Sequence, residues 1–538
     1  MAPAELLIAI LLVPLAAMMV AFVAQLFGGK AGPLIAEGAH VVSIVIVATI
    51  ALVLAGRVID GGNFFALGSW LYLDPLASIL VALIGVVGLL TGIYSLGYIR
   101  HDLAANLISP RQLCRYYGFF NLFLFTMLWT VTANDIVMMW VGIEATTLGS
   151  AFLVGLYGQR ASLEAAWKYV VICTVGVAFA LYGTMLVYAE ASAVLPDPHD
   201  ASLWTSLVSH AASLNPGVMR LAFVFVLIGF GTKAGLFPMH AWLPDAHSEA
   251  PSPVSALLSG VLVNCALFVL LRYSAITTAA TGPEFSRNLF LVFGGLSVAA
   301  ASLLIFVQKD LKRLFAYSTT ENMGLIVLGL GIGGPLGVAA AILQMINHSL
   351  AKTLLFCGSG NVLMKFGTRD LRSIRGMAAA APLSGALLIA GALALCGVPP
   401  FNIFVSEFML VTAGFRAGYG WLMVICLLLL TVTLAALLRF IGGSLLGARP
   451  ANVARGEVSG FAIAPMVALL VVMLLFGVAL PRPVGRLIEN AARVVLQSDV
   501  TAAAHAPRPG MDQQRPDQQM SPRSSGAAEF AAVTRRAN

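Results

Sequence analysis

Five ionisable residues lie deep inside long apolar stretches of this sequence: Glu144, Lys233, His348, Lys352 and Glu407. An ionisable side chain at such a depth costs at least roughly 2–3 kcal/mol in a bilayer, so each one needs a functional or structural reason. A desolvated lysine loses much of its preference for the charged form, and a nearby carboxylate restores that preference. A lysine whose carboxylate partner moves can therefore load and release a proton. We predict this role for Lys233 with Glu144.

Two helix interruptions accompany these residues. Glycines and Pro238 interrupt the apolar stretch that carries Lys233, and a Gly-Val-Pro-Pro motif at 397–400 precedes Glu407. A broken helix is tolerated at membrane depth only where it lines a cavity or packs inside protein. Two breaks at corresponding places in two halves of a chain are typical of an inverted-repeat transporter.

A structural interpretation competes with the proton path at each position. Lys233 and Glu144 could form a static ion pair. Lys352 and His348, which share one helix face at spacing i and i+4, could be satisfied polar packing. Glu407 could do no more than stabilise the helix break.

Seven further polar residues are secondary candidates for the path: Lys168, His240, Asp245, His247, Glu249, Asn264 and Glu321. The four between positions 240 and 249 are predicted to cap the helix break and an access path rather than to bind a metal. Lys168 and Glu321 are predicted near helix ends, where long side chains reach the membrane interface. Arg272 and Arg439 are predicted to be boundary anchors.

The composition indicates that this chain lies in a membrane, which is why the depth of an ionisable residue in the bilayer matters. Of 538 residues, 59% are hydrophobic and 10% are charged, and the mean hydropathy is +0.92. A soluble domain carries roughly a quarter charged residues, so we predict an all-α integral membrane protein. The six cysteines lie singly, without the spacing of a metal or iron–sulfur site. We therefore expect no metal, no cofactor and no redox centre in this chain.

Fourteen membrane spans of about 20 apolar residues or more are expected. They lie near 5–27, 34–55, 74–98, 114–133, 135–157, 163–189, 218–247, 253–276, 286–306, 312–331, 336–363, 382–415, 419–446 and 460–480. The first is expected to be a span rather than a signal peptide, since no Lys or Arg precedes it. The seventh and twelfth contain the two breaks.

Lys and Arg in short loops predict the orientation. They follow spans three, five, nine, eleven and thirteen, with Lys309, Lys312 and Arg313 after span nine, whereas the loop 190–217 has none. These basic loops should face the cytoplasm, with both termini outside, as an even number of spans requires. The net charge of +7 is explained by this bias, not by nucleic-acid binding. A short amphipathic stretch should end near Gln497, followed by a disordered tail over 499–538.

Four segments carry a family resemblance: 140–173, 232–273, 309–324 and 348–360. The second begins Lys-Ala-Gly-Leu-Phe-Pro-Met-His-Ala-Trp-Leu-Pro-Asp-Ala. The chain resembles the antiporter-like membrane subunits of respiratory complex I and of group 4 nickel–iron hydrogenase complexes, in particular component F of the hydrogenase-4 type, from about residue 70 to 480.

The resemblance implies a domain organisation. Helices one to three occupy 1–113, two inverted five-helix repeats occupy 114–278 and 279–447, a last helix with an amphipathic segment occupies 448–498, and a tail occupies 499–538. Each repeat should contain one broken helix.

The resemblance also implies residue roles. Glu144 would be the charge-pair carboxylate and Lys233 the central proton-carrying lysine. Lys352, with His348 beside it, would be the link in the second half, and Glu407 the terminal site there.

Span eight departs from the family pattern. Several relatives place a Lys or His there as a bridge, whereas this chain has Ser259, Asn264 and no cation before Arg272. Proton passage across the middle is therefore predicted to depend on water or hydroxyl groups.

The leading functional hypothesis is a proton-translocating subunit in a bacterial cytoplasmic membrane. Its expected partners are other membrane-arm subunits and a peripheral redox arm of the hydrogenase-4, formate hydrogenlyase or NADH-quinone oxidoreductase type. Alternatives are a sodium/proton antiporter component, a subunit that energises inorganic-carbon uptake, and a structural spacer without transport. A self-contained enzyme is disfavoured.

Overall fold

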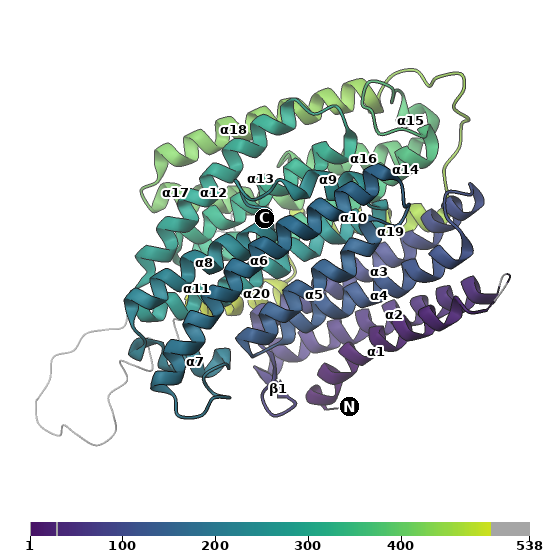
Figure 1. Ribbon diagram of the computed structural model, residues 1–538. Helices are drawn as coiled ribbons and strands as arrows, with labels where there is room; N and C mark the ends of the chain where they lie inside the picture. The colour runs from purple at the N-terminus through teal and green to yellow at the C-terminus, as the bar shows by residue number, and fades with distance from the viewer. Residues whose placement is uncertain (1, 28, 30, 497–538) are drawn as a thin grey trace, which may run out of the picture.

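The computed structural model describes residues 2–27, 29 and 31–496, and helices form most of this part of the chain (Figure 1). The expected disordered tail, 499–538, lies outside the described residues. Two short strands, β1 (Phe64–Ala66) and β2 (Leu71–Leu73), pair antiparallel in a hairpin between the second and third helices, with Phe64 opposite Leu73.

Four long helices begin the chain and pack against one another: α1 (Pro3–Ala24), α2 (Ala31–Gly61), α3 (Pro75–Ala104) and α4 (Pro110–Thr132). The next group comprises α5 (Ile136–Val154), α6 (Arg160–Val194), α7 (Trp204–His210), η1 (Ala211–Ser213), α8 (Pro216–Ala234), α9 (Trp242–Glu249), α10 (Ser252–Leu257), the π-helical turn η2 (Leu258–Leu262) and α11 (Val263–Thr281). Segments α10, η2 and α11 form one continuous helix, which is the expected span eight.

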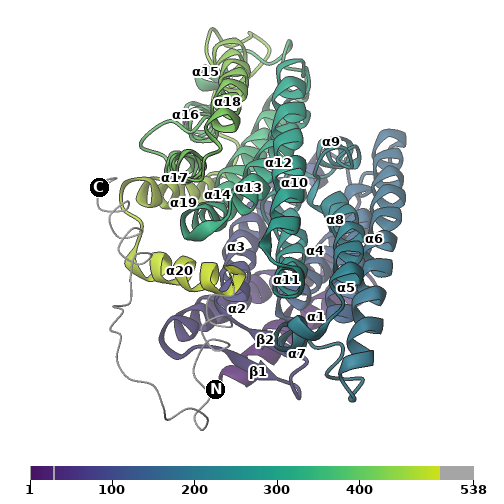
Figure 2. The same ribbon diagram turned by 90° about the vertical axis from the view of Figure 1, so that its left-hand side faces the viewer.

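The second half of the chain comprises α12 (Pro283–Phe306), α13 (Leu311–Ile332), α14 (Gly334–Phe366), α15 (Met377–Ala380), α16 (Pro382–Leu395), α17 (Asn402–Arg416), α18 (Gly420–Phe440), the π-helical turn η3 (Ile441–Leu445), α19 (Gly460–Val478) and α20 (Arg482–Leu496). The predicted amphipathic stretch is α20, whose buried face packs against α3 and α14. Figure 2 shows α20 running across the direction of the long helices.

Eleven of the described helices are long and apolar enough to cross a membrane. The three other expected spans correspond to α4, to α13 and to the pair α16–α17. Span eight and α14 are buried along the whole of their apolar windows. These two helices therefore form the centre of the bundle, and the other helices surround them.

Both expected helix interruptions are present. Helix α8 ends at Ala234, and Gly235 adopts a left-handed conformation with φ of 75° before α9 begins at Trp242. Helix α16 ends at Leu395, and Gly397 is also left-handed with φ of 64°. Glycine suits both positions because it adopts positive φ without the steric penalty of a Cβ atom.

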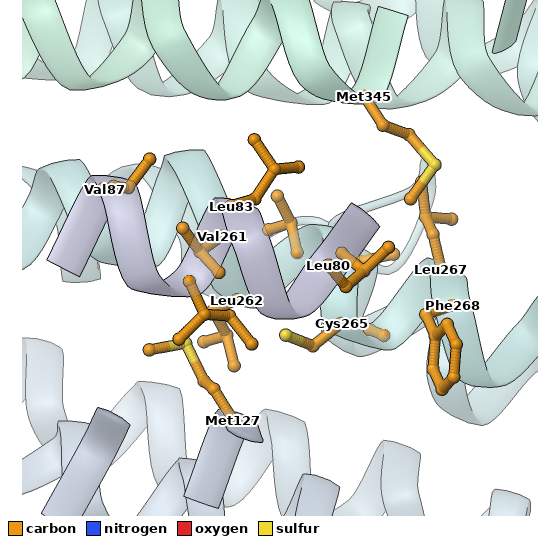
Figure 3. Close-up of a cluster of buried hydrophobic side chains, with 14 of the residues drawn as sticks. Leu80, Leu83, Val87, Met127, Val261, Leu262, Cys265, Leu267, Phe268 and Met345 are labelled. Carbon is orange, nitrogen blue, oxygen red and sulfur yellow. The ribbon is translucent and has the colours of Figure 1, made fainter. Parts of the chain in front are cut away.

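An apolar cluster fills the space between span eight and its neighbours (Figure 3). It includes Leu80, Leu83 and Val87 of α3, Met127 of α4, Val261, Leu262, Cys265, Leu267 and Phe268 of span eight, and Met345 of α14. Close packing of such side chains leaves little room for water. The face of span eight toward α3 and α4 is therefore an apolar core.

Arg272, which is predicted to anchor a helix at the membrane boundary, lies inside the protein rather than at its surface. Its side chain is 1% exposed and forms an ion pair of 2.6 Å with the fully buried carboxylate of Asp74. Asp74 also caps α3 by accepting a hydrogen bond of 2.8 Å from the Ala77 backbone N–H. The guanidinium carbon lies 4.1 Å from the centroid of the Trp204 ring, which adds a cation–π contact. Arg439, the other predicted anchor, is exposed and stacks on Phe306.

The buried pair yields a stability prediction. Asp74→Asn keeps the cap acceptor but leaves Arg272 without its counter-charge, which costs about 3–5 kcal/mol because a charge is left buried and unpaired. Arg272→Met should have a similar cost, and the double variant should recover part of it. Thermal unfolding of the purified membrane complex would measure the three variants.

The pair between Lys168 and Glu164, whose side chains are both about half exposed, provides the control. Glu164→Ala should change stability by only about 0–1 kcal/mol, since exposed pairs contribute little. Equal effects of Glu164→Ala and Asp74→Asn would contradict the importance of burial.

Candidate functional site

Lys233 lies in the last turn of α8, directly before the first helix break, and it is fully buried. Its ammonium group donates hydrogen bonds of 2.7 Å to the hydroxyl of Thr147 on α5 and of 2.7 Å to the hydroxyl of Tyr169 on α6. The Tyr169 hydroxyl also contacts the Ser150 hydroxyl at 2.7 Å. Uncharged hydroxyl groups thus replace the water that the ammonium has lost.

Glu144 lies three residues before Thr147 on the same helix, but it does not contact the lysine directly. Its Oε1 accepts a hydrogen bond of 2.8 Å from Thr174 on α6. Its Oε2 is buried and has no partner within the described part of the chain. Although both residues are described, Glu144 and Lys233 form no ion pair in this structure. The static pair considered as an alternative is therefore not present.

The second half contains a comparable lysine. Lys352 on α14 is fully buried and donates to the Phe315 carbonyl at 2.9 Å and to the Ser318 hydroxyl, both on α13. Glu321 lies three residues after Ser318. Its Oε1 accepts from Ser302 at 2.7 Å and from Thr433 at 2.5 Å.

The predicted position of Glu321 near a helix end is wrong, because it lies in the middle of α13 and is 2% exposed. With that correction, the two halves share one arrangement: a buried lysine, a hydroxyl on a neighbouring helix, and a carboxylate three residues from that hydroxyl. The members are Lys233, Thr147 and Glu144 in the first half, and Lys352, Ser318 and Glu321 in the second.

His348 lies one turn before Lys352 and is also fully buried. Its Nε2 is 3.1 Å from the carbonyl oxygen of Ser259 on span eight. Because a carbonyl only accepts, Nε2 carries the hydrogen, and Nδ1 has no partner among the described residues. The imidazole therefore has one buried nitrogen available to take up a proton.

Glu407 lies on α17, and its carboxylate folds back against the second helix break. A Cβ atom at Gly397 would lie 2.1 Å from Glu407 Oε2, so only glycine leaves room for the carboxylate. Glu407 is half-buried, and its contact with the break places its carboxylate beside backbone groups that the interrupted helix leaves free, as the sequence predicted.

Four side-chain amides and one hydroxyl form a buried network beside this break, and sequence reasoning missed this network. Its members are Asn322, Gln344, Asn347, Asn402 and Ser406. Gln344 donates to Asn322 at 2.7 Å, and Asn347 donates to the Asn402 carbonyl at 2.8 Å. The sequence contained a signal for this network, namely four Asn and Gln residues within apolar stretches. Burying a side-chain amide is costly unless it is hydrogen-bonded, so these residues could have been expected to bind one another.

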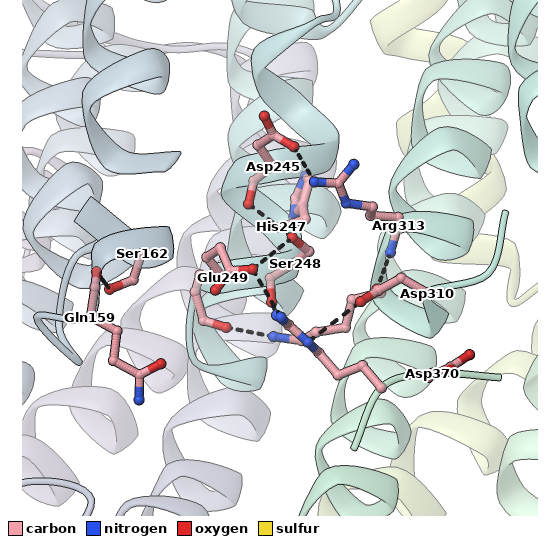
Figure 4. Close-up of polar contacts among 12 residues, drawn as sticks. Gln159, Ser162, Asp245, His247, Ser248, Glu249, Asp310, Arg313 and Asp370 are labelled. Atoms are coloured by element: carbon pink, nitrogen blue, oxygen red, sulfur yellow. Dashed lines mark hydrogen bonds and ion pairs between the residues drawn. The ribbon is translucent and has the colours of Figure 1, made fainter. Parts of the chain in front are cut away.

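Ion pairs tie α9 to three other segments, and Figure 4 shows the pair between Asp245 and Arg313. Asp245 binds Arg313 at 2.6 Å and Lys168 at 3.4 Å. Glu249 binds Arg369 at 2.9 Å. Helix α9, which follows the first break, is thereby joined to α6, α13 and the loop after α14.

Two histidines accompany this helix. His247 is fully buried, its ring lies 5.1 Å from that of Phe356, and neither ring nitrogen has a partner within the described residues. Phe356 is one turn after Lys352 on α14, so His247 approaches the second lysine. His240 lies in the break, 5.4 Å from the Phe237 ring. No cluster of three potential metal ligands is found in the part of the chain that the structure describes.

A cavity of about 560 Å³ opens beside α9 and is lined by Asp102, Tyr157, Glu249, Lys312 and Arg369, among others. Lys312 was grouped with loop cations in the sequence, but it is buried and donates to the Ala250 carbonyl at 2.5 Å. Tyr157, in the connection between α5 and α6, donates to Asp102 at 2.7 Å. Burial raises the pKa of Tyr157 well above its ordinary value, so the phenol remains a donor.

Asn264, the last secondary candidate, joins span eight to α14. Its side-chain amide donates to the Ser349 hydroxyl at 2.9 Å and to the Met345 carbonyl at 3.2 Å. Ser259 and Asn264 of span eight therefore both contact the second half.

Comparisons with known proteins agree with this geometry. Residues 133–433 match the family model described as NADH:quinone oxidoreductase/Mrp antiporter, transmembrane, and residues 62–106 match NADH-ubiquinone oxidoreductase (complex I), chain 5 N-terminus. A hydrogenase-4 component F homolog from Methylacidiphilum infernorum is 40% identical over 65% of this chain and 73% of its own length. NADH-quinone oxidoreductase subunit N from Desulforudis audaxviator is 31% identical over 72% of this chain and 75% of its own length.

The fold is also known from solved structures. A chain of an archaeal membrane-bound sulfane sulfur reductase complex superposes with a TM-score of 0.81 at 26% identity, over 93% of this chain and 99% of that one. The family model covers more than half of the sequence, including both helix breaks and the five ionisable positions Glu144, Lys233, His348, Lys352 and Glu407. The chain therefore belongs to the family of NADH:quinone oxidoreductase and Mrp antiporter transmembrane subunits, and it is an antiporter-like integral membrane subunit.

Proposed function

We propose that this subunit translocates protons across a bacterial cytoplasmic membrane, driven by redox chemistry in other subunits of its complex. The observation that carries the proposal is the environment of Lys233: a buried ammonium held by neutral hydroxyls, with an incompletely paired carboxylate on the adjacent helix turn. A proton-loading switch requires a charged group that can take two positions, one near the lysine and one away from it. A carboxylate that changes its hydrogen-bond partner in this way would raise and lower the proton affinity of the lysine.

The exchange of partners by Glu144 provides the switch. When its carboxylate turns from Thr174 toward Lys233, the added negative charge favours the protonated lysine. When it turns back to Thr174, as in this structure, the buried lysine loses that stabilisation and its proton affinity falls. Redox-driven movement in a neighbouring subunit would select between the two positions.

The second half would receive the proton and release it. Lys352 takes the role of Lys233 there, Glu321 takes that of Glu144, and His348 lies between the two halves. Glu407 is the terminal site. The second break beside it leaves backbone N–H and C=O groups without helical partners, and water can bind to them. In this proposal the chain crosses the membrane fourteen times, with α4–α11 and α12–η3 as inverted repeats and both termini outside.

The cavity beside α9 is the proposed cytoplasmic access route. The cavity is lined by the charged side chains of Glu249, Lys312 and Arg369, which favour the presence of water. It lies at the end of the bundle that carries the basic loops, which is the predicted cytoplasmic side. The proposed partners are further membrane subunits and a peripheral redox arm, since the relatives named above include subunits of hydrogenase and quinone-reducing types.

Lys233→Ala tests the central carrier. It should lower redox-driven acidification of inverted membrane vesicles at least roughly tenfold, because a path without the amine faces a barrier higher by about 1.4 kcal/mol or more. The measurement is made in sodium-free buffer on complexes with normal subunit content. Lys309→Ala, which removes an exposed lysine between α12 and α13, is the matched control and should acidify normally. Unchanged pumping by Lys233→Ala would assign the buried charges a structural role.

Glu144→Gln tests the switch separately from the carrier. The amide retains the contact with Thr174 but cannot supply negative charge to Lys233, so pumping should fall several-fold while assembly is preserved. Glu164→Gln, at an exposed carboxylate on α6, should have no effect. The ratio of protons moved to electrons transferred distinguishes the two outcomes, and an unaltered ratio in Glu144→Gln would remove this carboxylate from the mechanism.

A further inference from the structure

Lys233 and Lys352 lie in different halves, and span eight packs against both α8 and α14, which carry them. Its only basic residue among the described positions 252–281 is Arg272, which Asp74 holds at 2.6 Å. Val261, Leu262 and Cys265 on the same helix contribute to the apolar cluster toward α3 and α4 (Figure 3). A proton that crosses between the halves must therefore use the other side of span eight.

Helix α13 lies on that other side and carries three consecutive hydroxyl residues, Ser318, Thr319 and Thr320. Successive residues of a helix point about 100° apart, so the three side chains reach three different neighbours. All three are fully buried. Hydroxyl groups both donate and accept hydrogen bonds, which is the property that a proton relay needs.

Two of these hydroxyls have contacts that lead to the second half. The Ser318 hydroxyl accepts from Lys352. The Thr319 hydroxyl lies 2.7 Å from the hydroxyl of Ser259, whose carbonyl in turn accepts from His348. The π-helical turn η2 includes Ser259, and such turns interrupt the regular backbone ladder and make carbonyls available to side chains.

The third hydroxyl faces the first half. Thr320 Oγ1 lies 3.9 Å from the position that a Cβ atom at Gly235 would occupy, two residues after Lys233 at the helix break. It is buried and has no hydrogen-bond partner within the described residues. A buried hydroxyl without a protein partner is normally satisfied by an internal water molecule.

We propose that protons cross between the two halves by way of the hydroxyl groups of Thr320, Thr319 and Ser318 on α13, with water molecules bridging Thr320 to the first helix break and each hydroxyl to the next, instead of through a basic residue on span eight. The Ser259 hydroxyl, in contact with that of Thr319, extends the relay onto span eight, whereas the Ser259 carbonyl only holds the His348 ring in position. This inference rests on the proposed function and specifies its central step. No bond other than O–H and N–H bonds changes, and each hydroxyl returns to its starting state by accepting one proton as it passes on another.

Thr320→Val is the decisive variant, because valine keeps the shape and removes the hydroxyl. The ratio of protons moved to electrons transferred in inverted vesicles should fall at least roughly tenfold, as expected when a relay is interrupted. Thr320→Ser restores a hydroxyl and should retain at least half of the ratio. Thr91→Val is the matched control, since the Thr91 hydroxyl is equally buried but bonds only within α3.

The outcomes separate this inference from the proposed function. If Thr320→Val and Thr319→Val both pump like Thr91→Val while Lys233→Ala does not pump, the crossing lies elsewhere and the proposed function stands. If Lys233→Ala also pumps normally, the proposed function itself is wrong. Equal losses in Thr320→Val and Thr320→Ser would show a packing role and overturn the relay. Should Thr320→Val fail to assemble, Thr319→Val and Ser259→Ala carry the same test.

Discussion

The loss of hydration around buried ammonium groups is the constraint on which this structure depends. A lysine inside a bilayer protein must receive hydrogen bonds from neighbouring helices, and those helices must be held close enough to provide them. Thr147 and Tyr169 do this for Lys233, and Ser318 with the Phe315 carbonyl does it for Lys352. The lysines in turn fix the spacing of α5, α6 and α8, and of α13 and α14.

Neutral partners also make the arrangement responsive. A lysine that is salt-bridged permanently is held in one charge state, whereas one that is solvated by hydroxyls can change its state when a carboxylate moves. Glu144 and Glu321 each lie three residues from the hydroxyl that binds the lysine, so a change of rotamer rather than a movement of a helix suffices to alter the local charge. The repetition of this unit in both halves gives the proposed proton path two loading sites in series.

Much of the fold could be predicted from the sequence, because its signals are local. Glycine and proline mark both helix breaks, and runs of apolar residues mark the long helices. The depth of Lys233, His348 and Lys352 could also be predicted, since each lies far from the end of an apolar run.

The sequence could not show which face of a helix each polar residue occupies or which partner it meets. Arg272 and Glu321 were assigned to helix ends, yet Asp74 and the pair Ser302–Thr433 satisfy them in the interior. Lys312 was read as a loop cation for the same reason. Serine and threonine hydroxyls gave no distinct signal, because most of them in apolar helices bond only to their own backbone.

The π-helical turn in span eight has a consequence for the register of that helix. Each residue of an α-helix advances the side-chain direction by about 100°, and the wider turn at Leu258–Leu262 resets this angle once. The reset allows Ser259 to face α13 while Arg272, thirteen residues later, faces Asp74. Deleting one residue from η2 would rotate every following side chain about the helix axis. The polar and apolar faces of the helix after η2 would then no longer line up with those of the helix before it.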